Sequence, residues 1–432
     1  MIQQNWWTTQ LKTEGNPLQA LQTLVKADIV IVGAGMAGIA AAAAFVNKGL
    51  KVVMLEKNIF GGSSTGKSAG FLTPDSELEL WQLIRQFGKK KALKLWNAAE
   101  HGINLIAEHI KQHNIECDFE AQDSLFLGLG KKGGRDVMME LKAHKLLKLE
   151  QQIYSENTLD QVIGSTKYTK GILYKNTYVI NALSYCQGMK KWLLENNIEI
   201  YESTEVMEVN GHIVKTGQGS VIADRIIFCA DKLPSKITPL SKEIYPAQTF
   251  LAVSDPLHET LVKRMFPTGR YQCWDTDLIY TYFRLTSDNR ILIGGSNKLT
   301  TFSSREVSSP LVITKVIAKF KEKFPYLNDL EFIEFWPGKI DTTRDLLPIV
   351  TIDKEREWIY FVMGCAGLPW ASFCGDFVAR NVLGESNKDS ESFYKFFKPH
   401  RPTVFPSWLE SIIGKQLSFS INSLWSKYYR KK

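Results

Sequence analysis

The chain has 432 residues, of which 44% are hydrophobic and 23% charged; this length allows two domains, and the composition is that of an ordinary globular protein. Most of the net charge of +8 falls in residues 395–432, which hold eight Lys or Arg residues and one acid. The nearly neutral remainder argues against broad nucleic-acid binding. Six scattered cysteines form no C-x-x-C pair, so the sequence predicts no metal site, no disulfide framework and a reducing compartment.

Residues 1–26 form a polar lead, and the stretch from Asp28 to Glu56 then follows the order strand, glycine-rich turn, helix, strand. In such a unit Gly33 allows the tight turn, Gly35 lets the backbone approach a pyrophosphate, and Gly38 lets the helix pack closely on the sheet. The helix N-terminus offers free N–H groups to phosphates. Glu56 ends the second strand, where a carboxylate accepts hydrogen bonds from ribose hydroxyls. The stretch therefore predicts a dinucleotide site.

A second glycine-rich stretch, Gly61–Ser68, fits the phosphate-loop pattern of ATPases. In that motif the lysine lies in the first turn of a long helix that follows the strand directly. Here four residues intervene after the strand, and Pro74 breaks any helix that begins at Lys67. We therefore interpret this stretch as a loop beside Glu56 and not as an ATP site.

The remaining elements follow from periodicity. Helices are expected from Glu77 to about His113, interrupted at Gly88, and over 310–324; a hairpin at 124–129 is expected to precede a Lys/Leu-rich helix. Short strands are expected over 198–201, 205–209, 213–216, 221–222 and 225–230. A hairpin is expected over 279–285 with 290–295, and a strand–turn–helix unit over 358–384. We assign 27–115, 150–235 and 336–385 to a split dinucleotide domain, 116–149 and 236–335 to a β-rich substrate domain, and 386–432 to a basic tail.

Several stretches, in chain order, resemble the FAD-dependent D-amino-acid oxidase superfamily, in its glycine/sarcosine oxidase and γ-glutamylputrescine oxidase branch. The segments that carry the resemblance are Trp6-Trp7, Thr65–Gly70, Glu205–Val209, Ala223–Ala230, Tyr282–Gly295, Trp336–Gly338 with Thr343, Asp345 and Pro348, and Gly364–Trp370. The resemblance covers residues 1 to about 385. It implies an α/β fold, in which an FAD-binding, Rossmann-like domain of the glutathione-reductase type carries an inserted antiparallel substrate domain.

The resemblance also implies the cofactor and its contacts. The sarcosine branch attaches its flavin through a cysteine, at whose place this chain has Gly338, so we expect non-covalent FAD. The residues expected to bind FAD are Gly33, Gly35, Met36, Ala37, Gly38, Glu56, Lys57, Thr65, Gly66, Lys67, Ser68, Ala69, Gly70, Val206, Ala230, Gly338, Gly364, Gly367, Leu368 and Pro369.

The expected reaction is oxidation of the C–N bond of a primary or secondary amine or amino acid, with hydride transfer to flavin N5. Backbone N–H groups at Gly367 and Leu368 would stabilise the reduced ring. Family members of the glycine oxidase type grip the substrate carboxylate with an arginine where this chain has Ile340. Arg284 could take the place of this arginine, or it could be an ordinary hairpin residue. The residues expected to act in catalysis are Arg284, Tyr282 and Leu368.

Two further groups of residues are candidates for binding the substrate. Asp341 could hold a second ammonium of a polyamine-like substrate, although a structural role is the simpler reading. The aromatic side chains of Trp274, Tyr280, Tyr282 and Trp336 could enclose a cation, although aromatic residues at strand spacing more often form core.

The electron acceptor and the role of the tail stay open. The oxygen-activating lysine of the sarcosine branch is replaced by Leu292, so oxygen and quinone are both considered. Leu409, Ile413, Leu417, Ile421, Leu424 and Tyr428 form one apolar helical face with basic flanks, which suits either an anionic membrane surface or packing on the protein itself. The rivals to a cytoplasmic amine oxidoreductase are a peripheral membrane dehydrogenase, a non-catalytic FAD-fold binding protein and, more distantly, a tRNA-modifying flavoenzyme.

Overall fold

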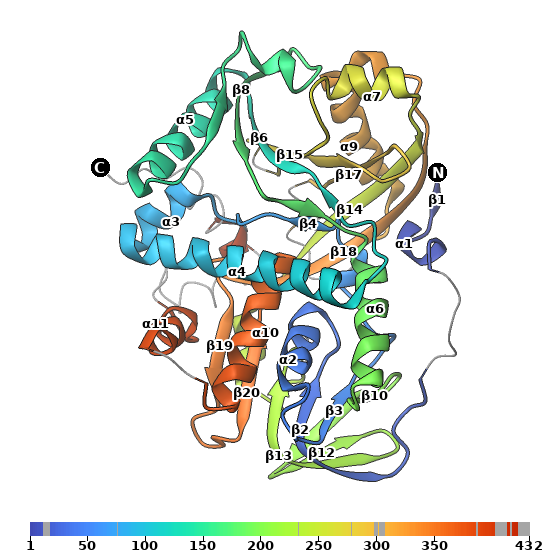
Figure 1. Cartoon of the computed structure of the whole chain (residues 1–432), viewed down its shortest axis with the longest axis vertical. Helices are drawn as coiled ribbons and strands as arrows, with labels where there is room; N and C mark the ends of the chain where they lie inside the picture. The colour runs from blue at the N-terminus through green and yellow to red at the C-terminus, as the bar shows by residue number, and fades with distance from the viewer. Residues whose placement is uncertain are drawn as a thin grey trace.

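The computed structural model describes residues 1–11, 18–75, 77–231, 233–277, 279–297, 301, 307–385, 388–401, 413–414 and 417–421. Two sheets lie one above the other in Figure 1, and a long helix, α4 (Lys89–His113), crosses between them. The lower part contains the glycine-rich unit found in the sequence, and the upper part is built mainly of antiparallel strands.

The lower sheet has a parallel centre. The strands β10 (Glu199–Tyr201), β3 (Val52–Leu55), β2 (Leu24–Val32), β13 (Ser220–Phe228) and β20 (Ile359–Met363) run parallel in that order. Antiparallel strands β12 (Ile213–Thr216), β11 (Val206–Asn210) and β19 (Ile349–Ile352) extend it. All residues of β3 and β20 are buried, as expected for parallel strands covered by helices. The helices α2 (Met36–Phe45), α6 (Ala182–Glu195) and α10 (Leu368–Val382) pack in this part.

The upper sheet has the strand order β1-β18-β14-β17-β16-β15-β6-β8-β7. Their bounds are β1 Ile2–Gln3, β18 Phe332–Thr343, β14 Ile244–Pro256, β17 Arg290–Gly295, β16 Tyr282–Leu285, β15 Tyr271–Asp275, β6 Asp123–Leu129, β8 Tyr168–Tyr174 and β7 Gln152–Tyr154. The helices α5 (Gly130–Leu147), α7 (Glu259–Met265) and α9 (Pro310–Lys323) accompany it, and Phe283, Phe320 and Phe324 form part of its core. A small sheet of β4 (Phe71–Leu72), β9 (Tyr178–Val179) and β5 (Glu120–Ala121) lies at the junction.

One assigned boundary needs correction. The sequence placed residues 150–235 in the dinucleotide domain, but β7 and β8 lie within this range and pair in the upper sheet, β8 with β6. The stretch 124–129 is likewise a single strand between β15 and β8 and not a hairpin. Both differences arise because the partner strands are distant in sequence, so local periodicity does not show which strands pair.

Several local predictions are confirmed. The long helix is broken at Gly88, where φ is 79°, into α3 (Leu80–Phe87) and α4. The hairpin β16–β17 and the helix α9 form where periodicity placed them. Residues Thr65–Lys67 make a short 3-10 turn, η1, followed by β4, so no long helix follows the lysine as a phosphate loop requires.

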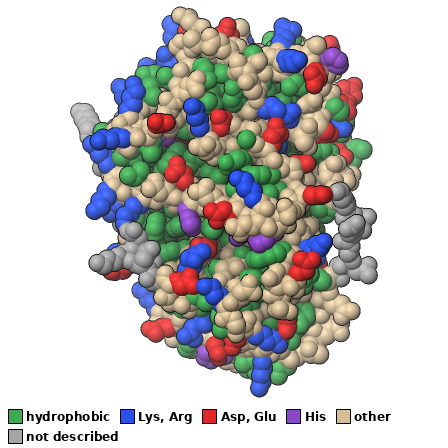
Figure 2. Space-filling view, in the orientation of Figure 1, with side chains coloured by type: hydrophobic (Ala, Val, Ile, Leu, Met, Phe, Trp, Pro, Cys, Tyr) green, Lys and Arg blue, Asp and Glu red, His purple; other side chains and the backbone are tan. Residues whose placement is uncertain are grey.

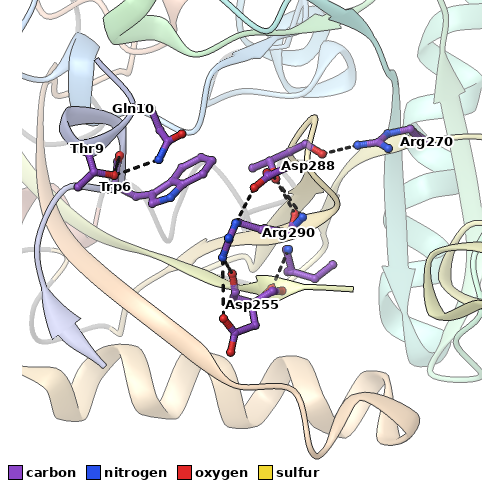
Figure 3. A network of polar contacts seen from close by, with 10 residues as sticks. Trp6, Thr9, Gln10, Asp255, Arg270, Asp288 and Arg290 are labelled. Atoms are coloured by element: carbon purple, nitrogen blue, oxygen red, sulfur yellow. Dashed lines mark hydrogen bonds and ion pairs between the residues drawn. The ribbon is translucent and has the colours of Figure 1, made fainter. Parts of the chain in front are cut away.

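The tip of the β16–β17 hairpin is held by charged side chains (Figure 3). Arg290 donates from Nε to Asp288 at 2.6 Å and also approaches Asp255 at 3.9 Å. Arg270 donates to the side chain of Asn289 in the same turn at 2.7 Å. In Figure 2 positive and negative side chains are interspersed over the viewed face, which fits the near-neutral body of the chain.

The described part of the tail packs on the protein itself. Phe397 at the end of α11 (Lys388–Phe397) is fully buried against Trp370, and Arg401 donates two hydrogen bonds to Asp345, at 2.6 and 2.7 Å. Phe419 is buried with its ring centroid 5.3 Å from that of Tyr245. These contacts favour the packing alternative for this part of the tail. Of the apolar face considered above, Leu409, Leu424 and Tyr428 lie outside the described residues.

No helix among the described residues is long and apolar enough to span a membrane.

Candidate active site

The glycine-rich unit, Glu56, Ala230 and Gly364 meet at one edge of the lower sheet. Gly33 follows β2, Glu56 follows β3, Ala230 comes shortly after β13, and Gly364 follows β20, and these parallel strands place their carboxyl ends at a common edge. Ligands of open parallel sheets bind outside this edge. The fold therefore brings these residues, which are far apart in the sequence, to one edge of the sheet.

Two glycines at this edge are required by close backbone contacts. Gly33 has φ of 102°, and a Cβ there would lie 2.4 Å from the Cys229 carbonyl oxygen. A Cβ on Gly38 would lie 1.9 Å from the carbonyl oxygen of Gly33. Both distances are far below van der Waals contact, so the turn and the helix approach only if these residues have no side chain.

Glu56 is fixed at the turn by backbone donors. Its two carboxylate oxygens accept hydrogen bonds from the N–H groups of Ala34 and Asn58, each at 2.9 Å, and the side chain is only 6% exposed. A carboxylate has further acceptor capacity, so this fixed group can still receive a ribose hydroxyl. Lys57 is exposed beside it, and Val206 is buried at the start of β11.

The loop after β3 is held through its carbonyl oxygens. Each carbonyl from Gly66 to Gly70 accepts a hydrogen bond from a distant part of the chain. In order, the donors are Asn5 Nδ2 (3.0 Å), Trp336 Nε1 (3.1 Å), Trp7 Nε1 (2.8 Å), Arg284 Nε (2.7 Å) and the backbone N–H of Ile180 (2.9 Å). Because the donors come from separated elements, the loop is fixed by the tertiary fold and not by its own sequence.

Arg284 helps to hold this loop and does not form a carboxylate clamp. The side chain is 2% exposed and donates to the carbonyl oxygens of Ala69, Leu285 and Ile180. It is not among the described residues that line the cavity below. Burial lowers the pKa of its guanidinium to about 10, which leaves it charged at neutral pH. This placement argues against the substrate-gripping role expected from the sequence.

A cavity of about 390 Å³ lies against the loop, β14, β18 and the N-terminus of α10. Eleven expected site residues are among its described lining: Met36, Thr65, Lys67, Ser68, Ala69, Gly70, Tyr282, Gly338, Gly367, Leu368 and Pro369. The other expected FAD contacts lie outside this lining, at the nucleotide edge or within the loop: Gly33, Gly35, Ala37, Gly38, Glu56, Lys57, Gly66, Val206, Ala230 and Gly364.

The cavity wall has features that suit a flavin. Among the described residues, the buried hydroxyl oxygens of Ser68 and Thr342 have no hydrogen-bond partner, and both residues line the cavity. Buried polar groups are normally paired, so these two hydroxyls fit a bound group that carries polar atoms. The free N–H groups at the N-terminus of α10 add a positive dipole end at Gly367 and Leu368.

One cysteine belongs to the described cavity lining. Cys365 lines the cavity, and a hydrogen bond with Cys374, together with burial, raises the pKa of its thiol well above the usual value. The thiolate is the reactive form of cysteine, so this shift favours the less reactive thiol.

The other candidate substrate contacts lie partly in the cavity lining and partly in the protein interior. Trp274, Tyr280 and Tyr282 line the cavity, and Ile340 does so where family members have arginine. Trp336 instead supports the loop. Asp341 is 6% exposed and is not among the described lining residues.

Sequence reasoning missed three features of this site. Asn5 holds the Gly66 carbonyl, and Asp231 accepts the N–H of Gly364. An acidic residue in place of the small residue expected after Ala230 was a visible signal for Asp231. The third feature is a set of carboxylates in the cavity lining, of which Asp75, Glu77 and Glu79 form an alternating acidic stretch that was a visible signal in the sequence.

The fold combines a split dinucleotide-binding part, whose turn depends on glycines, with a cavity beside an antiparallel sheet. These features are typical of flavin-binding oxidoreductases. Residues 28–380 match the model of the DAO family, described as FAD dependent oxidoreductase. The chain therefore belongs to this family and is an FAD-dependent oxidoreductase.

Related proteins agree with this assignment. The chain is 29% identical over 381 residues to a probable oxidoreductase OrdL of Haemophilus influenzae, covering 85% of each chain. It is 25% identical over 422 residues to the γ-glutamylputrescine oxidoreductase of Escherichia coli, covering 96% of this chain and 94% of the other. A crystal structure of glycine oxidase from Geobacillus kaustophilus has a TM-score of 0.75 at 16% identity, covering 88% of this chain and all of that one. The last comparison confirms the expected fold class.

Proposed function

We propose that the protein oxidises the C–N bond of a primary or secondary amine or of an amino acid. The observation that carries the proposal is the cavity in which the loop Lys67–Gly70, the β18 residue Gly338 and the N-terminus of α10 meet the aromatic side chains of the upper sheet. The activities named for a γ-glutamylputrescine oxidoreductase and a glycine oxidase among the similar proteins support an amine or amino-acid substrate.

In the proposed reaction the carbon next to the amine loses a hydride, and the nitrogen lone pair forms the C=N bond. The amine must first be neutral, because a protonated nitrogen has no lone pair. When bound, FAD supplies the two-electron acceptor for this hydride. Water then adds to the imine and releases a carbonyl product and the amine or ammonia.

The residues of the chain orient and stabilise the partners of this reaction. With FAD bound in the cavity, the N–H groups of Gly367 and Leu368 at the start of α10 would stabilise negative charge on the reduced ring, as an oxyanion hole does. The Tyr282 hydroxyl is hydrogen-bonded to Thr249 Oγ1 at 2.9 Å, and both residues line the cavity. Burial raises the pKa of Tyr282 far above neutrality, so it acts as a neutral hydrogen-bonding group and not as a base.

The test is the visible spectrum of the purified protein before and after anaerobic addition of amines, N-methyl amino acids and D-amino acids. A flavin band near about 450 nm that bleaches with one substrate class supports the proposal. A flavin that bleaches with none of them contradicts it and favours the non-catalytic reading. Readmission of air then identifies the acceptor, since peroxide release indicates an oxidase, and turnover only with a quinone or dye indicates a dehydrogenase.

A further inference from the structure

Two glycines of the upper sheet lie on either side of β14. Gly294 on β17 pairs with Leu251 of β14. Gly338 on β18 pairs with Thr249, which precedes Leu251 by two positions on the same strand. Directly paired residues, and residues two positions apart, share one face of a sheet. Both glycines therefore open on the face that carries Thr249 and Leu251, two residues that line the cavity.

The place of a side chain at Gly294 is filled by the ring of Tyr282. The two residues are paired on the neighbouring strands β16 and β17. A Cβ on Gly294 would lie 2.1 Å from the ring atoms Cε2 and Cζ of Tyr282 and 2.4 Å from its hydroxyl oxygen. The ring therefore lies over the Gly294 backbone, and a side chain at this position would displace it. Tyr282 lines the cavity, whereas Gly294 is not among the described lining residues.

Beyond Gly294 the Tyr282 hydroxyl reaches Thr249. The two hydroxyl oxygens are 2.9 Å apart, so the tyrosine side chain crosses β17 and ends at β14 in the order β16-β17-β14. Thr249 Oγ1 also donates to the carbonyl oxygen of Gly295 at 3.1 Å. A hydroxyl group has one proton and two lone pairs. Since the Thr249 proton is used by Gly295, the Tyr282 O–H donates to Thr249, and the Tyr282 oxygen keeps its lone pairs as acceptors.

The place of a side chain at Gly338 is open. Gly338 is buried, yet the nearest described atoms to a Cβ there, the Lys67 carbonyl oxygen and Thr249 Cγ2, are each 3.8 Å away. This open place lies between the loop and β14, in the part of the cavity proposed for the flavin. Thr249 borders it and also binds the Tyr282 hydroxyl. The Tyr282 oxygen is therefore held one residue away from the open place.

From this arrangement we infer that Gly294 and Thr249 are positioning residues, which hold the Tyr282 hydroxyl as an acceptor for an N–H group of the substrate. The inference rests on the proposed amine oxidation and adds the means by which the reacting nitrogen is oriented. Gly294 permits the ring to cross β17, and Thr249 fixes the direction of the phenol proton. A neutral nitrogen that donates an N–H to Tyr282 keeps its lone pair for the C=N bond.

The first experiment is a double-mutant cycle between Gly294 and Tyr282. Anaerobic flavin bleaching by butylamine, N-methylglycine and D-alanine is measured with the holoenzymes of the wild type, Gly294→Ala, Tyr282→Ala and the double variant. We expect each single variant to slow bleaching by the fastest probe roughly tenfold, because a displaced or missing hydroxyl no longer orients the nitrogen. In the double variant the added methyl group occupies the space that the ring leaves, so bleaching should be no slower than in Tyr282→Ala.

A second readout of the same cycle needs no substrate. Urea unfolding of the same proteins reports on the contact between residue 294 and the ring. Gly294→Ala should lower the urea midpoint when Tyr282 is present, because the methyl group clashes with the ring, and should change it little in Tyr282→Ala. Gly217→Ala is the matched control, because no atom lies within 4 Å of the added carbon. It should leave both flavin bleaching and the urea midpoint as in the wild type.

Thr249 gives a separate test of the direction of the hydroxyl. Thr249→Val keeps a side chain of similar shape but removes the acceptor of the Tyr282 proton, whereas Thr249→Ser keeps this acceptor. We expect Thr249→Val to raise the half-saturating concentration of the fastest probe roughly tenfold, and Thr249→Ser to stay within about threefold of the wild type. FAD affinity, titrated on the apoproteins, should be the same in both variants, since the hydroxyl acts on the substrate.

The outcomes separate the inference from the proposed function. If the wild-type flavin is bleached, but Gly294→Ala equals the wild type or its effect multiplies with that of Tyr282→Ala, Gly294 does not act through Tyr282. The inference is then overturned, and amine oxidation stands. Equal behaviour of Thr249→Val and Thr249→Ser overturns the role of Thr249 in the same way. If none of the three probes bleaches the wild-type flavin, both the proposed function and the inference fail.

Discussion

Single side chains with buried donors hold the carbonyl oxygens of the loop Gly66–Gly70. Trp7 reaches from the N-terminal helix α1 (Trp6–Thr9) to the Ser68 carbonyl, and the guanidinium of Arg284 lies 5.5 Å from the Trp7 ring. The N-terminal segment is also attached to the upper sheet, because β1 pairs with β18. The opening residues, which the sequence reading assigned to a polar lead, therefore form part of the site.

Replacing Trp7 by Phe tests this support. The ring is largely conserved, but the indole N–H that binds the Ser68 carbonyl at 2.8 Å is lost. An unpaired buried carbonyl costs about 1–3 kcal/mol, so we expect FAD to bind roughly tenfold more weakly, as measured by titration of the apoprotein. Trp6→Phe is the control, because it changes the neighbouring indole and leaves the Ser68 contact in place. Equal FAD affinity in the two variants would contradict a special role of Trp7.

A half-buried histidine gives the protein a pH-dependent stability. His109 on α4 contacts the Tyr185 hydroxyl at 3.1 Å and lies near the ring of Trp192. Burial, and then the neighbouring His113, lower the pKa of His109 to about 4, while Asp376 acts in the opposite direction. Since an unfolded histidine titrates near 6.5, the folded state binds fewer protons between these values. The stabilisation is therefore complete above about pH 6.5 and is lost as the pH falls towards 4.

We expect this effect to appear in urea unfolding at pH 7.5 and pH 5.0. The wild-type protein should lose about 2 kcal/mol between these conditions through His109, and His109→Gln should lose correspondingly less. His258→Gln is the control, since His258 is exposed on the other part of the molecule. The same pH dependence in the wild type and in His109→Gln would refute the assignment.

At the scale of the elements, the turn between β2 and α2 requires a residue without a side chain. Gly33→Ala introduces both an unfavourable positive φ and a backbone clash with Cys229. We expect this variant to lose its flavin band, because the clash separates the turn from β13. Gly49→Ala is the matched control: its φ is also positive at 72°, but no atom lies within 4 Å of the added carbon. It should lose only about 1 kcal/mol of stability and retain FAD.

The same elements show what the sequence could predict. Strand β2, helix α2 and strand β3 are adjacent in the chain, and their glycines and apolar runs report their own conformation, so this unit was predicted correctly. The placement of β8 depends on pairing with β6 across helix α5, and nothing in its own residues indicates that partner. Local patterns identify elements, whereas pairing between distant strands requires the fold.

The site divides in the same way. The loop Thr65–Gly70 and the turn at Gly367 could be proposed from sequence because each is a continuous stretch that resembles the family, and residues of both line the cavity. Arg284 could not be placed, since its partners Ala69 and Ile180 come from two other segments. Of the carboxylates in the cavity lining, three lie close together in the sequence between β4 and α3, and the others join them only in the fold.

At the scale of the whole molecule, described residues near both ends of the chain contribute to the active site. The N-terminal segment supports the loop Gly66–Gly70, and towards the C-terminus Phe419 and Ser420 are part of the cavity lining. Phe419 is 2% exposed, whereas Leu417, two positions earlier, is 54% exposed. This contrast is expected if the segment 417–421 covers the end of the β14–β18 ladder, where Tyr245 pairs with Thr342.

The tail therefore offers a decisive comparison between packing and lipid binding. Phe419→Ala removes a buried ring, a change that costs about 3–5 kcal/mol in a protein core, which is sufficient to undock so short a segment. We expect KM for the amine to rise and flavin fluorescence to become more accessible to iodide, while sedimentation with anionic vesicles is unchanged. Leu417→Ala is the control on the same segment, because its side chain is mostly in solvent. Two results together would contradict this expectation: the wild-type chain binds vesicles and Leu417→Ala does not, and Phe419→Ala leaves KM and iodide quenching unchanged. The segment would then serve a lipid surface and not the cavity.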